Sequence, residues 1–180
     1  HQSIIEAGGT QWMNSGMGIV HSERPSKELA ENGGTFEIIQ FWINAPSKNK
    51  MDQPSYQPLT KETTPVVSSD DGKIKIGVVA GELLGVKGII KPYSSLLTLR
   101  LEIKKGGKMD IPIPENYNAL VYQLDGLLNI NSNTETKAKD MIWLNNDGKS
   151  IHIEGLADTR AILLAGEPIN EKVESYGPFV

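Results

Sequence analysis

The 180-residue chain has 18 basic and 22 acidic residues, a formal net charge of −4, and 38% apolar residues. Because the basic residues are dispersed and give no positive excess, we expect neither nucleic acid nor a membrane surface as a direct partner. The chain contains no cysteine, which excludes disulfides, thiolate catalysis and cysteine-ligated zinc. It also lacks an apolar run of 18 residues that would span a bilayer, and we expect a cytoplasmic protein.

The first predicted elements surround a His-Ser-Glu triplet. Residues 20–23 follow Gly16 and Gly18, which allow a tight turn, and would carry His21 and Glu23 on one face if they are extended. A short helical turn is expected over residues 26–31, with Ser26 as its cap. Residues 35–43 are rich in β-branched and aromatic side chains, a composition that predicts a strand.

Residues 45–73 contain prolines and serines and show little periodicity, which is unusual for a loop inside one domain. We therefore expect a connector near residue 65 that separates domains at 1–64 and 65–180. Residues 78–82 (VVAGE) and 163–167 (LLAGE) resemble each other, which suggests an internal duplication of two β domains.

The second half of the chain predicts a series of short strands. In residues 97–103 four aliphatic side chains alternate with Thr98, Arg100 and Glu102, so one face is apolar. Further short strands are expected at 73–81, 126–131, 140–145, 150–155 and 160–166. Strands this short, separated by turn residues, are typical of a sandwich or a barrel, and we expect an all-β fold.

His21 and Glu23 are the first candidates for a site. In a strand, residues i and i+2 project from the same face, so an imidazole and a carboxylate would point together. That pair suits Fe(II) or another divalent transition metal as two ligands of a mononuclear site. The alternative is an exposed pair on a solvated face, because a single His-x-Glu is not a specific motif.

The other histidines are weaker candidates. His152 and Glu154 have the same spacing, but Ile151 and Ile153 should take the core face and leave the polar pair outside. Nothing in the sequence places His1. Gln40 lies between apolar residues, so it either bonds a backbone group in the core or lines a ligand pocket.

Several motifs, in order and at fitting distances, resemble the pirin family. The family has a Gln-Trp-Met segment, a glycine turn and a His-x-Glu motif, which correspond here to Gln11–Met13, Gly16–Gly18 and His21–Glu23. It also has a Gln-x-Trp-x-Asn motif, a Pro-x-Lys-x-Lys-Met motif and a C-terminal signature, which correspond to Gln40–Asn44, Pro46–Met51 and 163–180. The resemblance implies two packed cupin domains. The N-terminal one is expected to be incomplete in this chain, because the family's His-x-His segment has no counterpart in it. The C-terminal domain is expected to be structural and to hold no metal.

By this resemblance, His21 and Glu23 match the last two of the family's three His and one Glu ligands. The implied activity is oxidation of quercetin or a related flavonol by dioxygen at iron or another divalent metal. Glu23 would also accept the substrate's hydroxyl proton, and Met13 and Gln40 would form pocket walls. The alternatives are a non-catalytic iron-binding partner of transcription factors or enzymes, and a metal-free fragment. We expect a monomer when the chain is intact and association through exposed strand edges when it is truncated.

Overall fold

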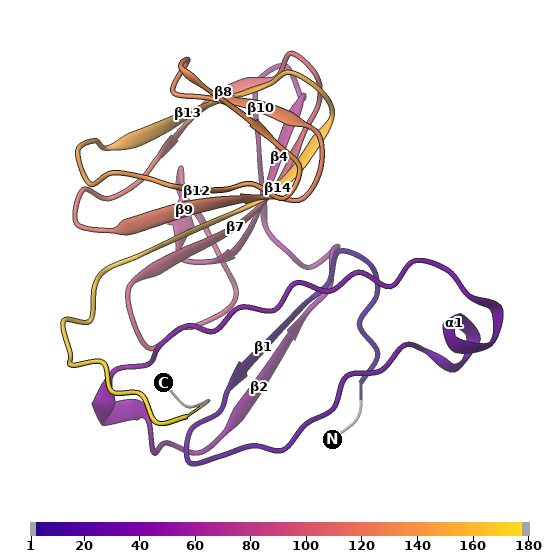
Figure 1. Ribbon diagram of the computed structural model, residues 1–180, viewed down its shortest axis with the longest axis vertical. Helices are drawn as coiled ribbons and strands as arrows, with labels where there is room; N and C mark the ends of the chain where they lie inside the picture. The colour runs from indigo at the N-terminus through magenta and orange to yellow at the C-terminus, as the bar shows by residue number, and fades with distance from the viewer. Residues whose placement is uncertain (1–2, 178–180) are drawn as a thin grey trace.

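The computed structural model describes residues 3–177, and within them β-strands dominate (Figure 1). The helical elements are α1 (Lys27–Asn32) and the 3-10 turn η1 (Ser47–Asn49). The strands are β1 (Thr10–Asn14), β2 (Ser55–Leu59), β3 (Val66–Ser68), β4 (Ile74–Ala80), β5 (Glu82–Leu83), β6 (Val86–Lys87), β7 (Leu96–Ile103), β8 (Lys108–Pro112), β9 (Asn118–Gln123), β10 (Leu127–Ile130), β11 (Thr134–Lys137), β12 (Met141–Trp143), β13 (Ser150–Gly155) and β14 (Thr159–Gly166). The prediction of an all-β fold is confirmed.

Strands β3 to β14 build a sandwich of two antiparallel sheets, with the short β5–β6 hairpin beside them. The larger sheet has the order β12-β9-β14-β7-β4-β3, and the smaller has the order β11-β10-β13-β8. Aliphatic side chains from both sheets form the main core, including Ile76, Leu99, Leu163, Ile111 and Ile151. The predicted apolar face of residues 97–103 is confirmed, because Leu97, Leu99, Leu101 and Ile103 are all buried, whereas Thr98 on the opposite face is also buried, at 4% exposure.

The two similar motifs do not mark two separate domains. Val78 on β4 and Leu163 on β14 are both register partners of Leu99 on β7, so both segments belong to one sheet of one sandwich. Their likeness reflects the same local requirement. Each is a buried antiparallel strand that ends at a glycine.

The N-terminal part contains a separate two-stranded sheet in which β1 and β2 pair antiparallel, with Met13 opposite Tyr56. The interpretation of residues 45–73 as a connector is wrong in this respect, because β2 and β3 both lie within that stretch. A second apolar cluster joins the hairpin to the sandwich, where Trp12 packs against Leu59, Val79, Ala80, Ile90 and Leu96. The register of β4 shifts between Val78 and Ala80, so the end of β4 faces this second cluster. The domain division at 64/65 stays a prediction.

Two local predictions around residues 26–43 had different outcomes. The helical turn is confirmed, since the Ser26 side chain accepts a hydrogen bond from the Leu29 N–H at 3.1 Å. The strand predicted at 35–43 is wrong, because that segment has no strand partner among residues 3–177. Instead, a side-chain ion pair joins it to the sandwich: Arg160 Nη1 lies 2.8 Å from Glu37 Oε1, and Arg160 Nε lies 2.6 Å from Asp125 Oδ2.

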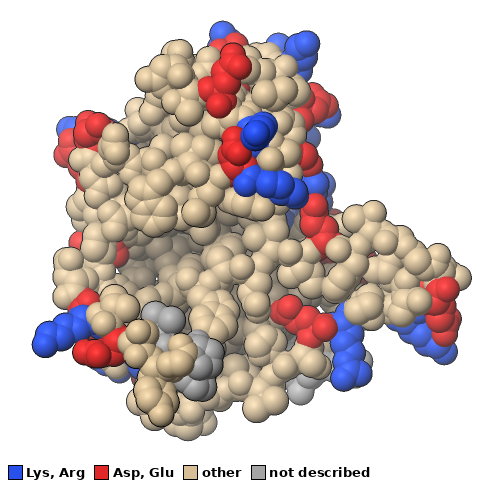
Figure 2. All heavy atoms as spheres, in the orientation of Figure 1, with Lys and Arg blue, Asp and Glu red and all other residues tan. Residues whose placement is uncertain are grey.

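The elements lie in layers that run from the small sheet through the large sheet to the N-terminal part. Figure 1 places β9, β12 and β7 on the side of the sandwich that faces the β1–β2 hairpin. Figure 2 shows a hollow between these two parts whose visible walls are mostly uncharged. Within the described residues, no helix has the length and apolar character needed to cross a membrane.

Candidate functional site

One face of the β1–β2 hairpin holds a hydrogen-bonded group around Gln11. Gln11 and Met13 are two residues apart on β1 and share a face. The Gln11 amide donates to Glu23 Oε1 at 2.8 Å and lies 3.8 Å from Met13 Sδ. The Tyr56 hydroxyl donates to Gln11 Oε1 at 3.2 Å. Gln11 therefore links the Glu23 carboxylate to β1, the strand that also carries Met13.

His21 and Glu23 lie in an irregular segment after the Gly16 turn. That tight turn is confirmed, since Gly16 has a φ of 51° and the Met17 N–H donates to the Asp52 carbonyl at 3.0 Å. Residues 18–25 form no strand, so the condition for a shared direction of His21 and Glu23, a strand at 20–23, is not met. The alternation argument for a shared direction of the two side chains therefore does not apply. Both side chains are exposed, and what brings Glu23 to the hairpin is the Gln11 amide.

Gln40 is exposed and lies in the strand-free segment 33–46. Its neighbours Phe41 and Trp42 are 37% and 80% exposed, so the segment does not pack as a core strand. The reading in which Gln40 bonds a core backbone group is wrong for this reason. Its role as a pocket wall stays a prediction, as do the roles of Met13, His21 and Glu23.

His21 and Glu23 carry donor atoms that suit a metal ion, but two ligands are too few for a mononuclear site. A neutral imidazole and a carboxylate are ligands that Fe(II), Ni(II) and Mn(II) accept. Glu23 Oε1 accepts a hydrogen bond from the neutral Gln11 amide, so the carboxylate is held in place by a group without a charge. Within residues 3–177, however, no group of three or more His, Cys, Asp or Glu side chains is arranged to hold a metal ion. His21 and Glu23 have the donor chemistry of metal ligands, and their assignment as ligands stays a prediction.

The second His-x-Glu pair is structural, as predicted. Ile151 and Ile153 are fully buried, which turns His152 and Glu154 to the other face of β13. His152 Nδ1 lies 2.8 Å from Asp110 Oδ1, and Glu154 Oε1 lies 3.0 Å from Lys108 Nζ. Both polar side chains therefore have cross-strand partners on β8. His1 lies outside the described residues.

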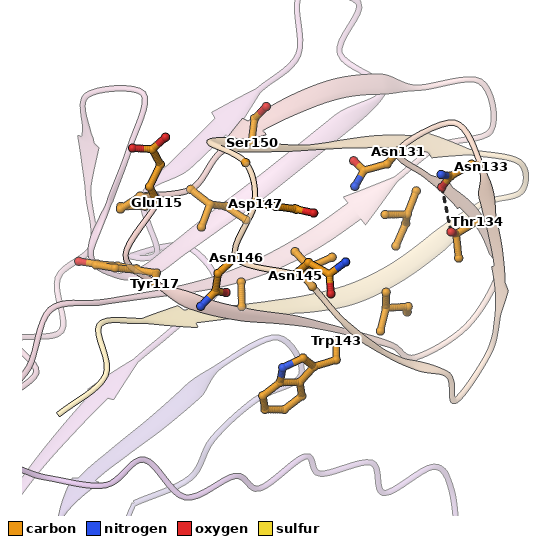
Figure 3. Close-up of a pocket in the computed structure, with 17 residues that line it drawn as sticks. Glu115, Tyr117, Asn131, Asn133, Thr134, Trp143, Asn145, Asn146, Asp147 and Ser150 are labelled. Atoms are coloured by element: carbon orange, nitrogen blue, oxygen red, sulfur yellow. Dashed lines mark hydrogen bonds between the residues drawn. The ribbon is translucent and has the colours of Figure 1, made fainter. Parts of the chain in front are cut away.

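A cavity of about 330 Å³ opens at one end of the sandwich, between the loops after β8, β10 and β12. Its apolar lining includes Ile113, Ile130 and Ile142, and its polar lining includes Asn131, Asn145 and Asp147. Figure 3 shows the side chains of Asn145 and Asp147 near the middle of this group, whereas the indole of Trp143 turns away from it. The lining contains no imidazole, and its size is at the lower limit for a small-molecule pocket, about 300 Å³.

Sequence reasoning missed the contribution of Gln11 and Tyr56. Gln11 entered the analysis only as part of a family motif, and Tyr56 lay in the presumed connector. The available signal was the position of Gln11 two residues before Met13 on a short alternating stretch. The partner strand, more than 40 residues later, gave no comparable signal.

The two-sheet sandwich and the attached hairpin define a cupin-type β protein, and comparison with known proteins narrows that class. The family model described as the Pirin C-terminal cupin domain matches residues 98–180, and the model described as Pirin matches residues 1–43. A pirin-like protein of Solanum lycopersicum is 36% identical over 100% of this chain and 60% of its own length. The chain belongs to the pirin family.

Solved structures agree with this assignment. The crystal structure of a quercetin 2,3-dioxygenase from Acinetobacter baumannii superposes with a TM-score of 0.91 at 35% identity, over 97% of this chain and 61% of that one. A bacterial pirin from Escherichia coli, solved in complex with nickel(II), shares the fold with a TM-score of 0.51 at 18% identity, over 68% of this chain and 48% of that one. The chain thus spans about 60% of the length of the tomato relative.

Proposed function

We propose that the protein is a metal-dependent dioxygenase acting on quercetin or a related flavonol, with His21 and Glu23 as two of its metal ligands. The observation that carries the proposal is the hydrogen bond of 2.8 Å by which the Gln11 amide holds the Glu23 carboxylate at β1. The family relationship supports it, since one relative is a quercetin 2,3-dioxygenase and another binds nickel(II). Two donors are too few for a mononuclear site, so the proposal requires further ligands from outside residues 3–177.

Each residue has a defined role in this proposal. The metal, Fe(II) or another divalent transition metal, supplies Lewis acidity and open positions for substrate oxygens. His21 contributes a neutral ring nitrogen as a ligand. Glu23 presents Oε2, which Gln11 leaves unoccupied, to the cation or to the hydroxyl proton of the flavonol. Gln11 acts as a positioning residue, while Met13 and Gln40 would border the aromatic substrate.

The test uses the full-length protein and a matched control that the chain itself provides. Metal content and oxygen uptake with quercetin are measured for the wild type, His21→Gln and Glu23→Gln. The control variants are His152→Gln and Glu154→Gln, which change the same residue types at the same spacing. We expect the first pair to lose most of the bound metal and the control pair to keep it. Equal metal content in all variants would contradict the assignment of the ligands.

The alternative function has its own outcome in this experiment. Stoichiometric metal that depends on His21 and Glu23, without oxygen uptake on any flavonol, supports a non-catalytic iron-binding partner of a transcription factor or an enzyme. A full-length protein that binds no divalent metal refutes both functions.

A further inference from the structure

A depression lies on the outer face of the six-stranded sheet, at its β3 edge. The register of β3, β4 and β7 arranges six outward-facing residues in two rows of three. These rows are Ser68–Lys75–Glu102 and Val66–Gly77–Arg100. Lys61, from the loop that follows β2, completes the lining. The depression is distinct from the Gln11–Glu23 group and is made by residues of different strands.

Gly77 allows Thr64 and Arg100 to approach the β4 backbone closely at the depression. It lies in the register between Val66 and Arg100, where any larger residue would place a side chain. A Cβ added at Gly77 would lie 3.1 Å from the Thr64 side chain and 3.4 Å from Arg100 Nε and Nη2. A side chain here would therefore crowd Thr64 and Arg100, and a cavity of about 360 Å³ has Gly77 and Arg100 in its lining.

The charges around the cavity do not balance. Three cations (Lys61, Lys75 and Arg100) face a single carboxylate, that of Glu102. Lys61 Nζ already lies 3.5 Å from Glu102 Oε1. Within residues 3–177, neither Lys75 nor Arg100 has a salt bridge. The lining therefore has a local formal charge of +2 (three cations less one anion) on a chain whose formal net charge is −4.

Arg100 has the most incomplete interactions of these cations. Its Nη2 donates to Thr64 Oγ1 at 3.0 Å, whereas Nε is enclosed and has no hydrogen-bond partner. A guanidinium has five N–H donors, and a partly buried cation is normally paired. Burial lowers the pKa of the Arg100 guanidinium, and the nearby Glu102 acts in the opposite direction. The side chain therefore lacks a counter-ion on its open side.

We propose that this depression binds a small oxyanion of the phosphate or sulfate class. Arg100 would donate from its free Nη1 in the planar geometry that suits such oxygens. Lys75 would contribute a point charge, and the Ser68 hydroxyl is a further donor on the same row. The site is independent of the proposed metal centre, and its failure would leave that proposal untouched.

The test is a titration of the full-length protein with inorganic phosphate at constant ionic strength, followed through backbone amide NMR shifts. We expect saturable shifts confined to β3, β4 and β7. Lys75→Gln should weaken binding about threefold, since an exposed ionic contact contributes about 0.2–1 kcal/mol. Arg100→Gln should weaken it about tenfold, in keeping with a hydrogen bond to a charged group. Lys108→Gln, on β8 of the other sheet, is the control and should bind as the wild type does.

A fallback variant and a second titration keep the proposal falsifiable. Because Arg100→Gln alters a partly buried group, Lys75→Gln at an exposed position provides the decisive variant if the former does not fold. Phenyl phosphate replaces inorganic phosphate in a second titration, and tighter binding assigns the site to a phosphomonoester rather than the free ion. Absence of saturation, or equal loss in Lys108→Gln, overturns the proposal. The proposal is also overturned if a carboxylate of the full-length protein, or of a second copy, is found to occupy the ion-pairing position of Arg100.

Discussion

Replacing Thr136 with valine should destabilise the protein, because it breaks one buried hydrogen bond. The replacement exposes no new surface, so the lost hydrogen bond is the cause of the change. The Thr136 hydroxyl donates to Gln123 Oε1, and the two residues are 4% and 0% exposed. Valine has nearly the same shape and cannot donate, so Gln123 Oε1 would lose its donor. Gln123 Nε2 would keep its bond to the Asp125 carbonyl at 3.3 Å. Leaving a buried acceptor without a partner costs about 1–3 kcal/mol.

Urea unfolding at 25 °C measures this cost, and two companion variants show its origin. Thr134→Val, on the same strand at an exposed position, should change the free energy of unfolding by less than about 0.5 kcal/mol. The double variant Thr136→Val with Gln123→Leu removes both polar partners and should cost less than the sum of the single changes. If Thr136→Val is as mild as Thr134→Val, or if the single costs simply add, the argument from the unpaired amide is wrong.

Two further predictions concern glycine conformation and pH. Gly126→Ala should lower the free energy of unfolding by about 2–5 kcal/mol, because φ is +78° and the added methyl would collide with Thr159 Oγ1 and the Asp158 carbonyl. Gly72→Ala, at φ +68° with open space around it, should lower it by about 1–2 kcal/mol. Similar losses for the two variants in thermal unfolding would contradict the steric reasoning. The Lys104 ammonium lowers the pKa of the Asp158 carboxyl through a hydrogen bond, so this pair stabilises the fold above the ordinary aspartate pKa and loses its effect as pH falls below about 4. Asp158→Asn should therefore flatten the acid limb of the stability profile, and an unchanged limb would refute this.

The sandwich could be predicted from the sequence because its signal is local. In β7 and β13 the alternation of aliphatic and polar residues alone assigns the buried aliphatic side chains, although Thr98 on the opposite face of β7 is buried as well. The cap at Ser26 is equally local, since the hydroxyl and the N–H it accepts are three residues apart. Such patterns require no knowledge of a distant partner.

The N-terminal part could not be predicted in the same way, because its pairing is distant. The β2 strand contains Pro58 and polar residues, and it forms only because β1, some 40 residues earlier, supplies its hydrogen bonds. Residues 35–43 have the composition of a strand, yet they remain without a strand partner among the described residues. Composition indicates that a segment can be a strand, whereas a neighbouring strand decides whether it is one.

The two His-x-Glu pairs show why spacing alone does not define a site. On β13, the Glu154 carboxylate is paired with the Lys108 ammonium and His152 Nδ1 lies against Asp110, so the negative charge of Glu154 is already balanced by a cross-strand partner. In the N-terminal segment, Glu23 is held by the neutral amide of Gln11, which orients the carboxylate without cancelling its charge. A cation could therefore bind the Glu23 carboxylate directly, whereas at Glu154 it would first have to displace the Lys108 ammonium. The chemical nature of the neighbour, rather than the interval in the sequence, makes one pair a candidate for ligation and the other a structural contact.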